Sequence, residues 1–114
     1  MTHNWVENLD VAVTICDKEG IIIEMNAKAC KTFQKYGGKE LIGKNLLDCH
    51  PGQSKEKLAE LLKNPRKNVY TIEKAGVKKM IYQTPWQDEA GNYAGLAEFS
   101  LEIPFEMPHF IRQA

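Results

Sequence analysis

The adjacent Cys49 and His50 are the residues of this sequence with the clearest chemical potential. A thiol beside an imidazole could ligate a haem iron or another metal, or could act as a nucleophile and its base. Adjacent side chains usually point in different directions, however, and no third ligand or orienting carboxylate follows at helical spacing. We therefore favour a structural role, with His50 capping a turn and Cys49 packing as a small apolar residue, and keep ligation as the alternative.

The composition indicates one domain with no surface for nucleic acid or for a membrane. The chain has 114 residues, and its 15 basic side chains balance its 15 acidic ones. No apolar run approaches the roughly 20 residues that span a bilayer, and the start at Met1 lacks the pattern of a signal peptide. Three cysteines fit neither a disulfide framework nor a paired-cysteine metal motif, so we expect free thiols and a cytoplasmic protein.

Two turns of the same chemistry frame the chain. Asp17 to Gly20 and Asp88 to Gly91 each place aspartate first and glycine last between apolar runs. Aspartate bonds the backbone two residues on, and glycine accepts the left-handed conformation that closes a short hairpin. The sequence therefore predicts two strands, a helical block and then three strands, which is an α+β arrangement with an antiparallel sheet.

The helical block can be placed from its capping residues. Asn26 is a good N-cap, and Gly37 can close the helix that it begins. A second helix is predicted over 54–63, and residues 41–50 between the two are expected to form short helical turns. Within these turns, we expect Gly43 to allow a tight turn or close packing, and we assign structural roles to both Asn26 and Gly43.

This order of elements resembles a PAS domain, a small sensory module. The resemblance rests on Asn26 to Pro51 and on the two strands around Asp17, and it covers roughly residues 9–103. It implies a PAS-like five-stranded antiparallel sheet with helices packed on one face, which together enclose a ligand-sized cavity. The expected boundaries are an N-terminal capping segment at 1–10, the PAS domain at 11–103 and a C-terminal tail at 104–114.

The alternation of side chains along the predicted strands suggests which residues line such a cavity. Met80, Tyr82, Thr84 and Trp86 share one face, and the 93–103 strand has an apolar set that contains Phe99. We expect around any pocket the following residues: Phe33, Tyr70, Tyr82, Trp86 and Phe99, with Cys49 and His50. The alternative, that these residues simply fill the core, carries equal weight.

Differences from well-known PAS subclasses reduce the number of cofactors that this sequence could bind. Gly43-Lys44-Asn45 is similar to the motif of flavin-binding light sensors, but Leu46 follows where they have the adduct-forming cysteine, so we do not expect a flavin. Haem-binding relatives take a histidine from the helix predicted here over 54–63, which has none. A haem would thus need His50. The segment from Cys49 also resembles PAS domains attached to hemerythrin-like domains.

We therefore expect a non-enzymatic sensory or signalling module that binds a small ligand or a protein partner. The alternative is a haem- or metal-binding sensor that uses His50 and Cys49. We also expect a homodimer, formed through the outer sheet face and the N-terminal segment. The apolar residues expected on that surface are Trp5, Leu9, Ala94 and Leu96.

Overall fold

The computed structural model describes residues 4–49 and 52–114. Its strands are β1 (Ala12–Asp17), β2 (Ile22–Met25), β3 (Asn68–Lys74), β4 (Val77–Gln87) and β5 (Tyr93–Ile103). Its α-helices are α1 (Asn4–Glu7), α2 (Ala27–Thr32) and α3 (Gly52–Lys63), and its 3₁₀ turns are η1 (Gln34–Tyr36), η2 (Gly38–Leu41) and η3 (Leu46–Cys49).

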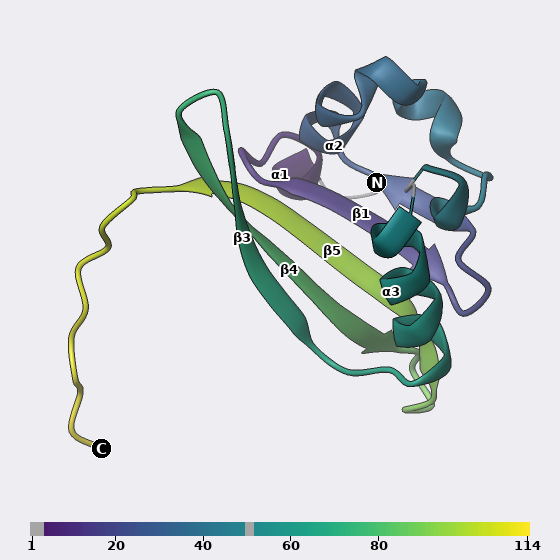
Figure 1. Ribbon diagram of the computed structural model, residues 1–114. Helices are drawn as coiled ribbons and strands as arrows, with labels where there is room; N and C mark the ends of the chain where they lie inside the picture. Colours follow the sequence, from purple (N-terminus) through teal and green to yellow (C-terminus); the bar gives the residue numbers. More distant parts are fainter. Residues whose placement is uncertain (1–3, 50–51) are drawn as a thin grey trace.

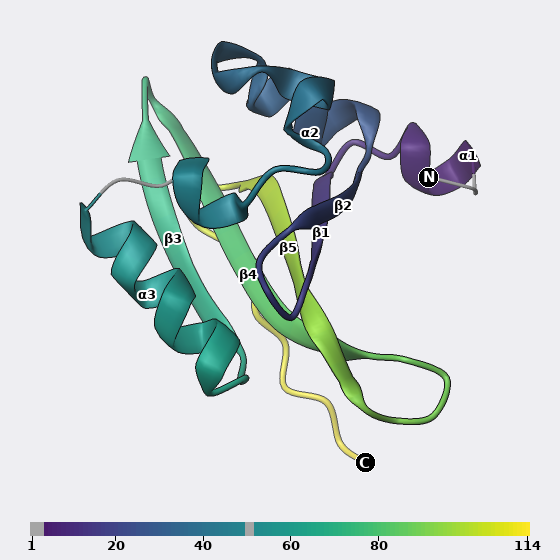
Figure 2. The same cartoon turned by 90° about the vertical axis from the view of Figure 1, so that its right-hand side faces the viewer.

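The strands form one antiparallel five-stranded sheet in the order β2-β1-β5-β4-β3 (Figure 1). The predicted α+β class is confirmed, as are the position of β2 at an edge beside β1 and the pairing of β1 with β5. Helices α2 and α3 and the 3₁₀ turns lie on one side of the sheet, whereas the C-terminal tail leaves on the other side (Figures 1 and 2). The sheet therefore has one helix-covered face and one face that these helices leave open.

Both predicted aspartate turns are present. Asp17 Oδ1 accepts hydrogen bonds from the backbone N–H of Glu19 (2.9 Å) and of Ile21 (3.0 Å). Asp88 Oδ1 likewise accepts from Ala90 N and Asn92 N, each at 3.0 Å. Because these bonds join residues that are at most four positions apart, the turns could be predicted from the local sequence.

Asn26 caps α2, the position that the sequence predicts for it, and also joins three segments. Its Oδ1 accepts from Ala29 N and from Val13 N, each at 3.0 Å. Its Nδ2 donates to Val6 O (2.9 Å) and Val11 O (2.8 Å). The side chain is fully buried. Asn26 therefore holds α1, the start of β1 and the start of α2 together, which is more than a cap requires.

The segment predicted as short helical turns consists of η2 and η3, with Gly43 between them. Gly43 has φ +93°, a conformation that L side chains rarely adopt, and no atom lies within 4 Å of where its Cβ would be. Its N–H donates to Ile22 O at 2.7 Å. Of the two roles expected for Gly43, the structure shows the tight turn and not close packing.

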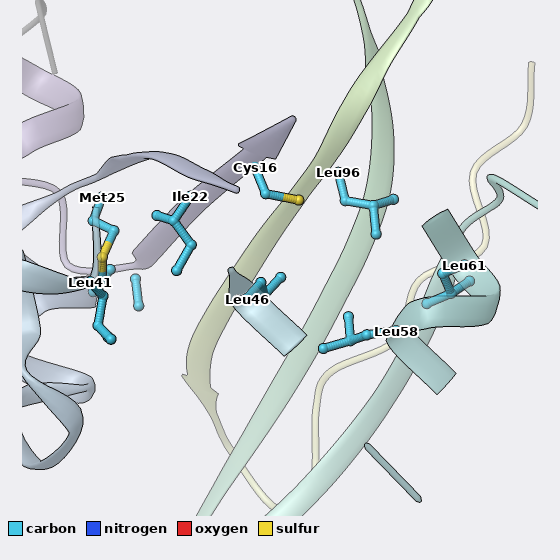
Figure 3. Packing of buried hydrophobic residues seen from close by; sticks show 10 residues of the cluster. Cys16, Ile22, Met25, Leu41, Leu46, Leu58, Leu61 and Leu96 are labelled. Atoms are coloured by element: carbon cyan, nitrogen blue, oxygen red, sulfur yellow. The ribbon is translucent and has the colours of Figure 1, made fainter. Parts of the chain in front are cut away.

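The hydrophobic core lies between the helices and the sheet. Leu58 and Leu61 of α3 point toward the side chains of Cys16 on β1 and Leu96 on β5, and Leu46 of η3 lies among them (Figure 3). The core also contains Ala12, Ile22, Met25, Ala29 and Leu41. This cluster fixes which face of the sheet the helices cover.

Candidate ligand site on the helix-covered face of the sheet

The core identifies the side chains that face the helices, and we call this side the inner face. Ala12, Cys16 and Leu96 are sheet residues packed against α3 and the 3₁₀ turns. Side chains alternate between faces along a strand, and directly paired residues of neighbouring strands share a face. From the observed pairing, the inner face also carries Thr14, Glu98, Ser100, Glu102, Lys79, Ile81, Gln83, Asn68 and Tyr70.

Four polar residues lie side by side across this inner face. Asn68 Nδ2 donates to Gln83 Oε1 at 2.8 Å, and Gln83 Nε2 donates to Glu98 Oε2 at 2.9 Å. Thr14 is the partner of Glu98 on β1. Thr14 and Gln83 are each 4% exposed, and Glu98 is 8% exposed. We call Thr14, Glu98, Gln83 and Asn68 the polar row.

The negative charge of Glu98 acts on neighbouring titratable groups. Burial raises the pKa of the Tyr70 hydroxyl, and the charge of Glu98 raises it further. Burial also raises the pKa of the Cys16 thiol, to which the charges of Asp17 and Glu98 add. Both groups lie on the inner face, on strands that lie on either side of β5 in the sheet.

An apolar cavity adjoins the polar row at Thr14. Its volume of about 10 Å³ is close to the space of one water molecule. Its walls come from β1, β2, η2 and η3 and from the end of α2, and its lining residues are Thr14, Ile22, Met25, Phe33, Leu41 and Leu46. A larger molecule would reach the polar row only after these walls had separated.

A second, open cleft of about 200 Å³ lies on the same face, beyond the polar row. Ser100 lines it and is two residues from Glu98 along β5. An ion pair of 3.0 Å joins Lys28 of α2 to Asp10 at its wall. The other lining residues are Thr32, Lys79, Leu101 and Glu102. Solvent therefore comes close to the polar row from the α2 side.

The structure divides the predicted pocket aromatics between the two faces. Phe33 lines the cavity, and Tyr70 lies on the inner face. The placement of Tyr82, Trp86 and Phe99 on the inner face is wrong, because their pairing puts them on the outer face. The outer face is also rich in apolar side chains, so apolar character alone does not indicate which face a residue lies on. No observation tests whether any of the five contacts a ligand.

Gly95 explains why Trp86 lies on the outer face. Its indole Nε1 donates to Cys16 O at 3.0 Å, across the β5 position that Gly95 occupies. A Cβ on Gly95 would lie 1.9 Å from Cys16 O, so any other residue there would force the strands apart. The close approach of β1 and β5 at Gly95 thus gives Trp86 its hydrogen-bond acceptor.

The polar row itself was not predicted. On β5 it belongs to the set Ala94, Leu96, Glu98, Ser100 and Glu102, whose composition is typical of a solvent-facing set. Leu96 is 2% exposed and belongs to the core between the helices and the sheet, so its expected place on the outer surface is wrong. A signal was present in Gln83 and Glu98, which share the alternation phase of Ile81 and Leu96.

The predicted Cys49 and His50 site lies outside what the structure describes. The backbone of η3 is described to Cys49, whereas the Cys49 side chain, His50 and Pro51 are outside the described residues. Within the described ranges, no three His, Cys, Asp or Glu side chains gather where they could hold a metal ion. The Cys49 and His50 site therefore stays a prediction.

Comparison with known proteins identifies the family. A family model described as PAS domain matches residues 10–90. The chain belongs to the PAS domain family. No curated protein gives a significant match. In the described part of this PAS domain, no helix is long and apolar enough to cross a membrane.

Solved structures share this fold at low sequence identity. The PAS domain of Bordetella pertussis BvgS is 16% identical, with a TM-score of 0.67 over 87% of this chain and 81% of that one. The Aer2 receptor of Vibrio cholerae, described as a dual PAS-heme oxygen sensor, is 20% identical, with a TM-score of 0.66 over 82% and 95%. A sensory box sensor histidine kinase from Vibrio cholerae is 16% identical, with a TM-score of 0.63 over 89% and 87%. PAS domains of this kind are sensory modules, as in histidine kinases and other sensors.

Proposed function

We propose that this PAS domain senses a small molecule that binds between the helices and the inner face, and that it has no catalytic activity. The observation that supports this proposal is the polar row, in which Thr14, Gln83 and Glu98 are buried beside the apolar core between the helices and the sheet. Burying polar groups costs free energy unless their hydrogen bonds are satisfied, so apolar residues would stabilise the fold more simply.

The alternative is that the row serves the fold alone, as a closed internal network. A carboxylate has about four acceptor positions, and a threonine hydroxyl can both donate and accept. The Asn68-Gln83-Glu98 chain uses one acceptor position of the carboxylate, on Oε2. The row therefore keeps acceptor capacity beside the cavity at Thr14, which a closed network would not need.

Aromatic walls on the inner face suit a flat ligand. Phe33 lines the cavity, and Tyr70 lies on β3 opposite Ile81. Tyr70 is 44% exposed, so its ring is accessible from the side of β3. Ligand sites typically combine apolar and aromatic walls with a few polar groups that fix orientation, which is the composition of this face.

Substitution of Gln83 tests this function. We expect Gln83→Leu to remove the polar row without changing the sheet, with Gln87→Leu as a matched control at an exposed position of the same strand. A fragment library screened by ligand-observed NMR should give binders that the control retains and Gln83→Leu loses. Equal binding to both variants, or no binder to the parent chain, would contradict the proposal.

The described residues do not fit a haem. The sequence of α3 has no histidine, and the residues that line the cavity include none. The described histidine, His109, lies in the C-terminal tail and is exposed. The haem-binding alternative thus depends on His50, which is outside the described residues.

We propose that the domain passes on its signal as a homodimer. The two copies would contact each other through the outer face, the side of the sheet that α2 and α3 leave open (Figures 1 and 2). Apolar side chains share that face, and they include Val13, Ile15, Met80, Tyr82, Trp86, Ala97, Phe99 and Leu101. Strands β1, β3, β4 and β5 contain 35 residues. With a rise of about 3.3 Å per residue and a spacing of about 4.8 Å between neighbouring strands, they cover a flat area of roughly 550 Å² per copy. Two copies would bury roughly 1,100 Å², near the lower bound for specific interfaces.

The C-terminal tail could enlarge this interface. It leaves β5 on the side opposite α2 and α3 (Figure 1). Its large apolar side chains are 53–89% exposed, namely Phe105, Met107, Phe110 and Ile111. A second copy on the outer face would lie on the same side as these side chains, which is why we favour a homodimer over another protein partner.

A further inference from the structure

We propose that the ligand of the inner face is a small planar cation, of the amidinium or guanidinium class, which pairs with the carboxylate of Glu98. This inference rests on the proposed function and specifies the chemistry of the same site.

The first argument is charge balance. Glu98 is 8% exposed, and an isolated buried carboxylate is costly unless a cation pairs with it. Within residues 4–49 and 52–114, the ion pairs join Lys28 to Asp10, and Lys57 and Arg66 to Glu60. None of them involves Glu98, whose described hydrogen-bond partner is the neutral amide of Gln83.

The second argument is the direction of the hydrogen bonds in the row. Asn68 donates to Gln83, and Gln83 donates to Glu98, so the chain of bonds ends on an acceptor. Among the described residues, Gln83 is the side chain that donates to this carboxylate, and an amidinium could add two N–H donors in a planar, two-pronged arrangement. An anionic ligand would instead meet the negative charge of Glu98 in a site largely removed from water.

The third argument is the shape and charge of the surroundings. Phe33 and Tyr70 offer aromatic faces, and cations bind favourably over such rings. Tyr70 lies on the same face of the sheet as Glu98, and burial together with the charge of Glu98 raises the pKa of its hydroxyl. A cationic group placed between them is stabilised by the carboxylate and by the ring together.

Access requires the cavity walls to move. Leu41 and Leu46 close the cavity, and they belong to the 3₁₀ turns η2 and η3. The ligand therefore enters between these turns and the inner face.

Three probes of nearly the same shape test the inference: benzamidine, benzamide and benzoate, which are cationic, neutral and anionic. Each is added at millimolar concentration to the full chain, to Glu98→Gln and to Glu102→Gln, and the thermal midpoint is recorded. Glu102 is a matched control because it lies on the same face of the same strand and is exposed. We expect benzamidine to raise the midpoint of the parent chain and of Glu102→Gln, with at least a tenfold loss of affinity in Glu98→Gln, and benzoate to have no effect.

The outcomes separate the inference from the function on which it rests. The inference that the ligand is a cation is contradicted if benzamide or benzoate binds as tightly as benzamidine. It is also contradicted if Glu98→Gln leaves the affinity for benzamidine unchanged. Absence of benzamidine binding contradicts it as well. The proposed function is judged separately by the loss of library fragments in Gln83→Leu, which does not depend on ligand charge. A neutral fragment lost in that variant would leave the function standing while the cation inference failed.

Discussion

Gln83 and Glu98 occupy directly paired positions of β4 and β5, and Gln83 Nε2 donates to Glu98 Oε2 at 2.9 Å. Both side chains are more than nine-tenths buried. The centre of the sheet thus carries an amide-carboxylate pair where a purely structural sheet would carry apolar residues. Residues that are kept for binding often lower the stability of the unliganded fold, and this trade-off can be measured.

Glu98→Gln is expected to stabilise the ligand-free chain at neutral pH. The substitution keeps a side-chain oxygen that can accept from Gln83 and removes a buried charge that lacks a described cationic partner. We expect the free energy of unfolding to rise by about 1 kcal/mol. Urea unfolding followed by tryptophan fluorescence measures this change. The exposed control Glu102→Gln should change little, and a loss of stability in Glu98→Gln would indicate a structural role.

Asn26→Ala should be much more damaging than the removal of a simple helix cap. Its four hydrogen bonds reach Ala29, Val13, Val6 and Val11, and its side chain is fully buried. Losing them leaves buried backbone groups unsatisfied, so we expect a cost of about 3 kcal/mol, compared with about 1 kcal/mol for a cap alone.

Asn45→Ala is the control for Asn26→Ala. Asn45 Oδ1 accepts from Leu47 N at 2.9 Å and its Nδ2 donates to Glu19 O at 3.2 Å, in a more exposed part of the chain. We expect the control to cost about 1 kcal/mol. Chemical denaturation of the two variants gives both changes in the free energy of unfolding, provided that its dependence on denaturant concentration is the same as in the parent chain. Equal costs would show that Asn26 acts only as a local cap.

The local turns and helix caps could be predicted from the sequence, whereas the side of the sheet that each strand residue faces could not. The Asp17 turn and the Asn26 cap depend on residues close in sequence, so their chemistry is visible in the chain. Phe99 and Glu98 are adjacent, and the rule that apolar side chains face the core assigns Phe99 to the inside. In the structure, Glu98 lies on the inner face as part of the polar row, and Phe99 lies on the outer face among other apolar side chains.

Stability should decrease above about pH 9 through the Cys16 thiol. Burial raises the pKa of its thiol above the model-compound value of 9.0, so the folded state retains a proton that the unfolded state loses. The stabilisation is complete below about pH 9 and is lost as the pH rises toward the higher folded-state pKa. Cys16→Ala should therefore flatten the fall in unfolding free energy measured between neutral pH and pH 10. Burial also raises the pKa of the Cys30 thiol, which is less buried, so Cys30→Ala should flatten the fall to a smaller extent than Cys16→Ala.

Self-association should depend on the outer face. Tyr82 and Phe99 are directly paired there, so Tyr82→Lys places a charge in the middle of the proposed interface. Sedimentation velocity should show a dimer for the parent chain and a monomer for this variant. The control is Tyr36→Lys, the same change at a residue that is 53% exposed on η1. A parent chain that stays monomeric up to near-millimolar concentration would contradict the homodimer.

Haemin titration tests the alternative cofactor. We expect no sharp Soret band at one equivalent of haemin, because neither α3 nor the described lining of the cavity has a histidine that could ligate the iron. The titration is repeated with His50→Ala. A stoichiometric band that this variant abolishes would make Cys49 and His50 the centre of the mechanism.

The most direct test of the central claim is the position of ligand-induced chemical-shift changes in ¹⁵N NMR spectra. The side-chain amide of Gln83 lies in the polar row, and the indole Nε1–H of Trp86 lies on the opposite face. We predict that benzamidine shifts the Gln83 amide and leaves the Trp86 indole unchanged. A shift at Trp86 with an unchanged Gln83 amide would contradict a ligand site on the inner face.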